Sequence, residues 1–279
     1  MSFFADILKS VLFGVVQGIT EWLPISSTGH MILLDEFITL GVSDEFKEMF
    51  FVVIQLGSAL AVLWLFFDRL DPFSKNKSAD EKKGTLLLWL KVAAAVIPSA
   101  AAGLFLDDFF DEHFYSFVPV SIALIAYGVL FIALERYRKD KAPKMQNCSD
   151  VSFGRAFLIG SFQVLSLIPG TSRSGSTILG AMLLGLSRTA SAEFSFFMAL
   201  PTMAGASGLK VVKFLLDGAS VSGGEALILA LGTFTAFLVS LAVIKFLLDF
   251  VRRHDFVPFG IYRIALGGTI LLYFFAKNA

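Results

Sequence analysis

Apolar residues run through this chain in long blocks separated by short polar stretches. A helix needs about 20 predominantly apolar residues to cross the hydrocarbon core of a bilayer. Six blocks reach this length, three without a charged residue and three with one or two: 49–67, 86–106, 114–134, 194–216, 226–244 and 257–276. The pattern therefore predicts six membrane-spanning helices.

Two further apolar segments, 3–40 and 153–187, are interrupted before they reach this length. Their breaks are QGITEWLPISSTGH at residues 17–30 and PGTSRSGS at residues 169–176. Each break contains proline, glycine, hydroxyl groups and at least one ionisable side chain. Non-helical backbone is tolerated at membrane depth only where protein buries it or where it lines a wet cavity. We therefore expect each segment to form a re-entrant helical hairpin that turns back at its break.

The charges of the connecting loops indicate the orientation in the membrane. The loops at 68–83, 135–144 and 252–255 are basic, whereas the segment at 107–114 is acidic and contains no Lys or Arg. Because Lys and Arg are enriched in cytoplasmic loops, the three basic loops are assigned to the cytoplasm, and the acidic loop and the C-terminus to the outside. The first hairpin then enters from the outside, and the second enters from the cytoplasm.

Each half of the chain then consists of one broken hairpin followed by three transmembrane helices. Three crossings is an odd number, so the second half must be inverted relative to the first. The two breaks also resemble each other, GVVQGITEWLPISSTG against IGSFQVLSLIPGTSRSG. This similarity pairs Gln17 with Gln163, Pro24 with Pro169 and Ser27 with Ser172.

The predicted fold is therefore an all-α polytopic membrane protein with an inverted-topology repeat. It forms a single membrane domain over residues 1–279, with internal repeats at about 1–137 and 151–276. Short interrupted segments in corresponding halves of an inverted repeat point to a binding site near the bilayer midplane.

Composition supports the membrane assignment and excludes other classes. The chain is 56% hydrophobic and 16% charged, whereas a soluble domain is about 45–50% apolar and about 25% charged. Its net charge of zero gives no basis for binding nucleic acid. The single cysteine, Cys148, excludes an intramolecular disulfide.

The second break has the features of an anion site. Arg173 carries a planar, permanently charged guanidinium that fits phosphate or carboxylate in a bidentate manner. The neighbouring hydroxyls supply further donors, and a helix beginning just after the break would direct its positive end at an anion. The alternative is that Arg173 pairs with a buried carboxylate for structural reasons, although an ionisable group inside a membrane is functional by default.

The first break carries candidate catalytic groups. Gln17 and Glu21 are four residues apart and share one face of a helix, where Glu21 could act as a general base or bind a divalent cation. Ser27 and His30 are three residues apart, close enough for the imidazole to activate the hydroxyl if this stretch is helical. Three alternatives remain open: attack by Ser27, attack by His30, and attack by a water that Glu21 activates. Ser26, Ser27 and Thr28 could instead cap the following helix.

Both breaks resemble the signature motifs of the bacterial undecaprenyl pyrophosphate phosphatase family, of the bacitracin-resistance type. In the first motif Gln17 and Glu21 take the acidic positions, and SSTGH follows with Ser27 and His30. Many relatives have a second Glu at the position of Gln17, so a cation here would have one carboxylate fewer. The second motif, P-G-x-S-R-S-x-x-T, is matched by Pro169, Gly170, Ser172, Arg173, Ser174 and Thr177. The resemblance extends over the whole chain in length, spans and motif placement.

The resemblance implies an enzyme of the bacterial cytoplasmic membrane that hydrolyses undecaprenyl pyrophosphate to the monophosphate and recycles this carrier lipid for cell-wall synthesis. It implies a divalent cation, Mg²⁺ or Ca²⁺, held at Glu21 and Gln17, a pocket open to the periplasmic side, and a homodimer. Catalysis would use Glu21, Ser27, His30 and Arg173. The phosphate would be bound by Arg173 with the hydroxyls of Ser172, Ser174, Thr177 and Ser26. The alternative hypothesis is a transporter or flippase for a phosphate-bearing lipid, since the inverted repeat is a transporter architecture.

Overall fold

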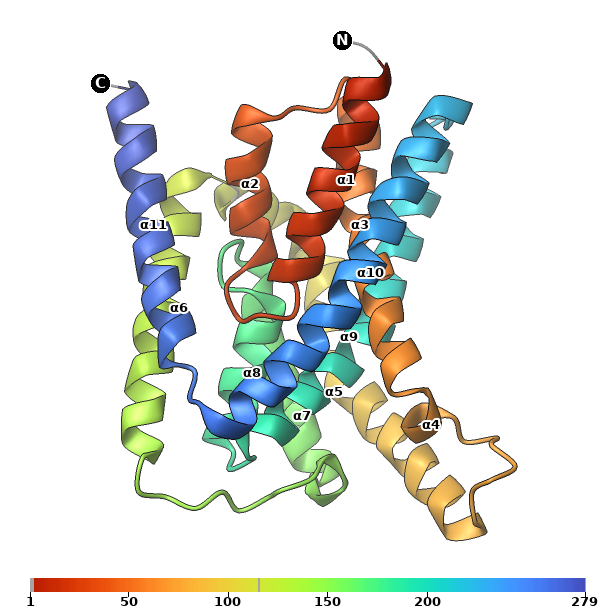
Figure 1. Ribbon diagram of the computed structural model, residues 1–279, viewed down its shortest axis with the longest axis vertical. Helices are drawn as coiled ribbons and strands as arrows, with labels where there is room; N and C mark the ends of the chain where they lie inside the picture. Colours follow the sequence, from red (N-terminus) through yellow and green to blue (C-terminus); the bar gives the residue numbers. More distant parts are fainter. Residues whose placement is uncertain (1–2, 115, 279) are drawn as a thin grey trace.

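The computed structural model describes residues 3–114 and 116–278, and these residues form an all-α bundle (Figure 1). The helices of the first half are α1 (Phe3–Thr20), α2 (Ser27–Phe37), α3 (Asp44–Leu65), α4 (Phe67–Leu70), α5 (Ala79–Phe114) and α6 (Phe117–Arg138). The helices of the second half are η1 (Cys148–Asp150), α7 (Phe153–Val164), η2 (Leu165–Leu167), α8 (Arg173–Leu183), α9 (Arg188–Leu216), α10 (Gly223–Arg253) and α11 (Val257–Asn278).

Seven helices in the described part of the chain are long and apolar enough to cross a membrane. Six of them, α3, α5, α6, α9, α10 and α11, coincide with the predicted spans, and α1 is the seventh. The protein is therefore an all-α, multi-pass membrane protein. Hydrophobic side chains remain exposed along its outer surface, such as Trp64 and Phe105, as expected when lipid rather than water is the solvent.

The prediction that residues 107–114 form a loop is wrong, because α5 continues as a helix to Phe114. The side chains of Asp107, Asp108 and Asp111 lie outside the described residues. With 36 residues, α5 is about 54 Å long at 1.5 Å per residue, whereas the hydrocarbon core is about 30 Å thick. The acidic segment can therefore be the final turns of a helix that extends beyond the bilayer, without needing to be a loop.

Both interrupted segments form helical hairpins. The helix α1 stops at Thr20 and the chain resumes as α2 at Ser27, while α7 and η2 end at Leu167 and α8 begins at Arg173. In Figure 1, α2 runs back alongside α1, and the turn between them lies near the middle of the molecule, next to the loop that precedes α8. Hydrogen bonds between Ser174, Arg173 and Glu21 join the two breaks directly.

Glycines allow each hairpin to pack tightly against a long helix. A methyl group on Gly14 of α1 would lie 2.5 Å from the carbonyl oxygen of Gly232 on α10. A methyl group on Gly160 of α7 would overlap with the carbonyl oxygen of Ala95 on α5. Small residues at such contacts let membrane helices approach closely, and this close packing drives their association.

We predict that Gly160→Ala lowers the thermal unfolding midpoint of the purified protein in detergent. The added methyl group meets backbone, which can yield only if α5 and α7 move apart, and such overpacking costs about 1–3 kcal/mol. Gly154→Ala on the same helix is the control, because nothing lies within 4 Å of the methyl group that it would add. Equal midpoints for the two variants would contradict the close contact between α5 and α7.

Candidate active site

Two serines give the breaks the same local geometry. Ser26 has φ 73° and Ser172 has φ 72°, and they are the two non-glycine residues with positive φ within residues 3–114 and 116–278. Each is the N-cap of the helix that follows, and its hydroxyl accepts a hydrogen bond from Gly29 N at 3.3 Å or from Gly175 N at 3.1 Å. Strained backbone of this kind costs about 1–3 kcal/mol and clusters at functional sites.

This geometry shifts the alignment of the two breaks by one residue relative to the sequence pairing. Ser26, and not Ser27, is the structural counterpart of Ser172. Ser27 and Arg173 are then equivalent, because each is the first residue of the helix after its break. The predicted capping role therefore falls on Ser26, and the hydroxyl of Ser27 is used elsewhere.

The carboxylate of Glu21 is the centre where the two breaks meet. Its side chain is 4% exposed. Its Oε1 accepts a hydrogen bond from Arg173 Nη2 at 2.8 Å, and its Oε2 accepts from Gln17 Nε2 at 2.9 Å and from Ser27 Oγ at 3.0 Å. Three of the four predicted catalytic groups, Glu21, Ser27 and Arg173, are thus brought together by one carboxylate.

The guanidinium of Arg173 is anchored on three sides. Besides Glu21, its Nη1 donates to the carbonyl oxygen of Ser195 on α9 at 2.8 Å, and its central carbon lies 5.5 Å from the Trp22 ring centroid. Its Nε is buried without a hydrogen-bond partner among the described residues. A buried donor without a partner is costly and calls for an explanation. We interpret this N–H as a donor that is available to a ligand oxygen.

The predicted phosphate-binding hydroxyls lie around Arg173 but already have protein partners. Ser174 donates to the Glu21 carbonyl oxygen at 2.9 Å and lies 3.2 Å from the Ser172 hydroxyl. Thr177 donates to the carbonyl oxygen of Arg173 at 2.9 Å and lies 2.6 Å from the Ser195 hydroxyl. These contacts order the first turn of α8, whose N-terminus is a suitable place for an anion.

The expected contact between His30 and Ser27 is not made, although residues 27–30 are helical. His30 Nδ1 lies 2.7 Å from the carbonyl oxygen of Ser26, and Nε2 lies 2.7 Å from the hydroxyl of Tyr262 on α11. Both ring nitrogens are therefore occupied, while the Ser27 hydroxyl turns to Glu21. The pairing predicted for Ser27 is corrected from His30 to Glu21.

Arg263 on α11 binds the backbone of both breaks. It is fully buried, and it donates to Pro24 O at 3.0 Å, to Gly170 O at 2.8 Å and to Thr171 O at 2.9 Å. These carbonyls lie where the helices are interrupted, so they lack helical partners, and bare carbonyls are not tolerated at membrane depth. A lone arginine in an apolar span was its only sequence signal. Trp22 and Ser195 had no separate signal.

The protein groups alone do not form a cation cage. No cluster of three or more His, Cys, Asp or Glu side chains occurs in residues 3–114 and 116–278. Glu21 is the carboxylate at the site, and the amide of Gln17 uses its nitrogen to donate to Glu21. A cation would therefore need most of its oxygen ligands from elsewhere, as Mg²⁺ does when it binds one or two carboxylates and substrate phosphates.

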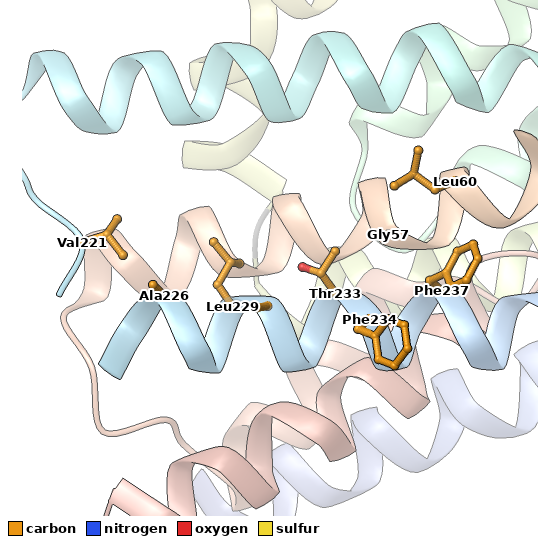
Figure 2. Close-up of a pocket in the computed structure, with 9 residues that line it drawn as sticks. Gly57, Leu60, Val221, Ala226, Leu229, Thr233, Phe234 and Phe237 are labelled. Atoms are coloured by element: carbon orange, nitrogen blue, oxygen red, sulfur yellow. The ribbon is translucent and has the colours of Figure 1, made fainter. Parts of the chain in front are cut away.

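Two hollows lie outside this constellation. One is an apolar groove between α3 and α10 with a volume of about 490 Å³. Leu60, Thr233 and Phe237 are among its lining residues (Figure 2). A second cavity of about 520 Å³ lies between α2, α6 and α11, and its lining includes Met31 and Asp35. None of Glu21, Ser27, His30 and Arg173 lines either of these two pockets.

The fold and site together define a class: an integral membrane protein with a carboxylate, a hydroxyl and a guanidinium converging where two broken helices meet.

The sequence profile described as "Bacitracin resistance protein BacA" matches residues 10–269. An undecaprenyl-diphosphatase of Enterococcus faecalis is 53% identical over 270 residues, which cover 97% of this chain and 98% of that protein. An undecaprenyl-diphosphatase of Streptococcus pyogenes serotype M4 is 53% identical over 272 residues, which cover 98% of each chain. The chain belongs to the BacA, or undecaprenyl-diphosphatase, family.

We predict that Arg263→Met lowers the unfolding midpoint in detergent strongly, and that Arg263→Lys lowers it less. Methionine leaves the three carbonyls without partners, at about 1–3 kcal/mol for each, whereas lysine retains a charge and three donors. The control is Arg252→Met on α10, because Arg252 is exposed and pairs with Asp249 of the same helix, α10. Arg263→Met as stable as the control would mean that the breaks do not depend on this side chain.

Proposed function

We propose that this protein hydrolyses undecaprenyl pyrophosphate to undecaprenyl phosphate and inorganic phosphate, and so recycles the carrier lipid for cell-wall synthesis. The observation that carries this proposal is the sharing of the Glu21 carboxylate by Ser27 and Arg173. The proposed nucleophile Ser27 and the anion-binding guanidinium of Arg173 are each within hydrogen-bonding reach of the proposed base Glu21. The names of the two relatives point to the same activity.

In the first step, Glu21 Oε2 takes the proton of the Ser27 hydroxyl as Ser27 Oγ attacks the terminal phosphorus. The bond from that phosphorus to the bridging oxygen breaks, undecaprenyl phosphate leaves with the electron pair, and a phosphoserine forms. In the second step a water attacks the phosphoserine, and Glu21 returns its proton to Ser27. Arg173 exchanges its contact with Glu21 for the phosphoryl oxygens, and this electrostatic positioning is the main task in phosphoryl transfer.

We propose that Mg²⁺ or Ca²⁺ acts with the substrate rather than as a permanent ligand of the protein. Glu21 and the carbonyl oxygen of Gln17 would hold it together with the pyrophosphate oxygens. When bound, the cation neutralises charge on the phosphates. Because Gln17 supplies no second carboxylate, we expect cation affinity to depend strongly on whether the pyrophosphate is present.

We propose that the two halves are inverted repeats, and their packing supports this. The helix α1 packs on α10 as α7 packs on α5, and α3 packs on α10 as α9 packs on α5. Gly14 and Gly160, each three residues before its paired glutamine, make the close contacts in the two hairpins. Inverted repeats are also a transporter architecture, so a lipid transporter or flippase is the second candidate function. The homodimer implied by the family resemblance stays a prediction.

We place the protein in the bacterial cytoplasmic membrane with the site open to the outside, and we predict the labelling pattern that follows. In intact cells, a membrane-impermeant thiol reagent should label Ser220→Cys between α9 and α10, and should label Asn76→Cys only after permeabilisation. Cys148 provides the unlabelled background, because burial raises the pKa of its thiol. The reverse pattern would contradict the orientation.

The activity is tested by phosphate release from a long-chain isoprenyl pyrophosphate in detergent, with Mg²⁺ or Ca²⁺. We expect Arg173→Ala, Glu21→Gln and Ser27→Ala each to reduce release at least about 100-fold, the usual loss when a charge-stabilising or acid–base group is removed. Arg252→Ala, at an exposed residue, should leave it unchanged. No release with either cation, or undiminished release from Arg173→Ala, would favour the transport hypothesis.

A further inference from the structure

Tyr262 covers the one nitrogen of His30 that the backbone does not use. A carbonyl oxygen can only accept a hydrogen bond, so His30 Nδ1, 2.7 Å from Ser26 O, must carry the proton. In the neutral imidazole, Nε2 then has a lone pair, and the Tyr262 hydroxyl at 2.7 Å donates to it. The Ser26 carbonyl and Tyr262 together select one tautomer of His30.

The orientation of the two rings agrees with this assignment. The lone pair of an imidazole nitrogen lies in the plane of the ring, so a donor must approach within that plane. The rings of His30 and Tyr262 are inclined by 2°, with centroids 5.6 Å apart. The Tyr262 hydroxyl can in turn accept one further hydrogen bond through its oxygen. Tyr262 is 44% exposed in the structure.

His30 cannot serve Ser27 in this arrangement, but it lies on the same side of α2. Residues three apart share one face of a helix, so His30 follows Ser27 by one turn on that face of α2 and presents Tyr262 from α11. Glu21 already accepts the hydrogen bond of the Ser27 hydroxyl. The proposed reaction has a second proton to remove, that of the water which attacks the phosphoserine, and Glu21 is protonated at that stage.

We infer that Tyr262 and His30 form the proton relay for this second step. The attacking water donates its proton to the Tyr262 oxygen, the Tyr262 hydroxyl proton moves to His30 Nε2, and the water oxygen forms the new bond to phosphorus. The bond between phosphorus and Ser27 Oγ breaks, and Ser27 takes the proton held by Glu21. Inorganic phosphate leaves, and His30 then returns its proton to solvent. This inference rests on the proposed function.

The charged groups around His30 suit a base that must gain a proton transiently. On α11 these are the titratable hydroxyl of Tyr262 and the buried guanidinium of Arg263. From α6 the neighbouring contact is apolar, because Leu124 packs against the adjacent Gly29. Arg263 opposes lasting protonation of His30, which favours return of the proton after each turnover.

The test is Tyr262→Phe, which removes the hydroxyl and keeps the ring. With a pyrophosphate substrate labelled in its terminal phosphate, we expect steady-state release to fall about 10-fold to 100-fold, within the range of general-base effects. The formation of phosphoserine should be unaffected, so acid-quenched samples should show labelled protein building up toward one phosphate per chain. A merely structural role of Tyr262 would slow both steps and would not cause this accumulation.

The matched control is Tyr273→Phe, three helical turns farther along α11, where the ring packs against Phe37. This variant should behave like the wild type. Release and labelling by Tyr262→Phe equal to those of the wild type would overturn the relay. Absence of release from the wild type would instead overturn the proposed function, and wild-type release with no labelled protein in Tyr262→Phe would show that water does not attack a phosphoserine through Tyr262.

Discussion

The structure depends on a solution to one problem, which is how two helices can be broken at membrane depth. A broken helix exposes carbonyl oxygens that neither lipid nor the helix itself can satisfy. Arg263 donates to carbonyls of both breaks at once, and the positive φ of Ser26 and Ser172 lets each hydroxyl cap the next helix. Satisfying the backbone in this way also brings the two breaks together, so the stabilising device and the assembly of the site are the same feature.

A second buried interaction acts within this frame. The ion pair between Arg173 and Glu21 has geometry that a buried pair requires, with the remaining carboxylate oxygen bonded to Gln17 and Ser27. Buried pairs are seldom a net source of stability because desolvation offsets their attraction. In the proposed reaction, the pair keeps the guanidinium of Arg173 ordered until the pyrophosphate replaces Glu21 beside it.

In the proposed reaction, the separation of Ser27 from His30 provides two distinct acid–base groups. Glu21 is bonded to Ser27, while His30 is held between the Ser26 carbonyl and Tyr262. Two groups with separate partners can hold protons at different times, which a reaction with two successive proton removals requires. The distance along the chain between Tyr262 and the first break explains why no motif links them.

The order of apolar blocks, the two breaks and the family motifs are local properties. The sequence by itself was therefore enough to predict six spans and both hairpins, and to select Glu21, Ser27 and Arg173 as candidate site residues. The extent of α5 was not predictable, because acidic residues indicate a segment outside the bilayer whether its backbone is a loop or a helix. Which groups pair was decided only by the tertiary structure. Ser27 meets Glu21 rather than His30, and Arg263 meets carbonyls rather than a carboxylate, because hydrogen-bond partners depend on the backbone turn at Ser26 and on how α11 packs. Spacing along the chain specifies neither.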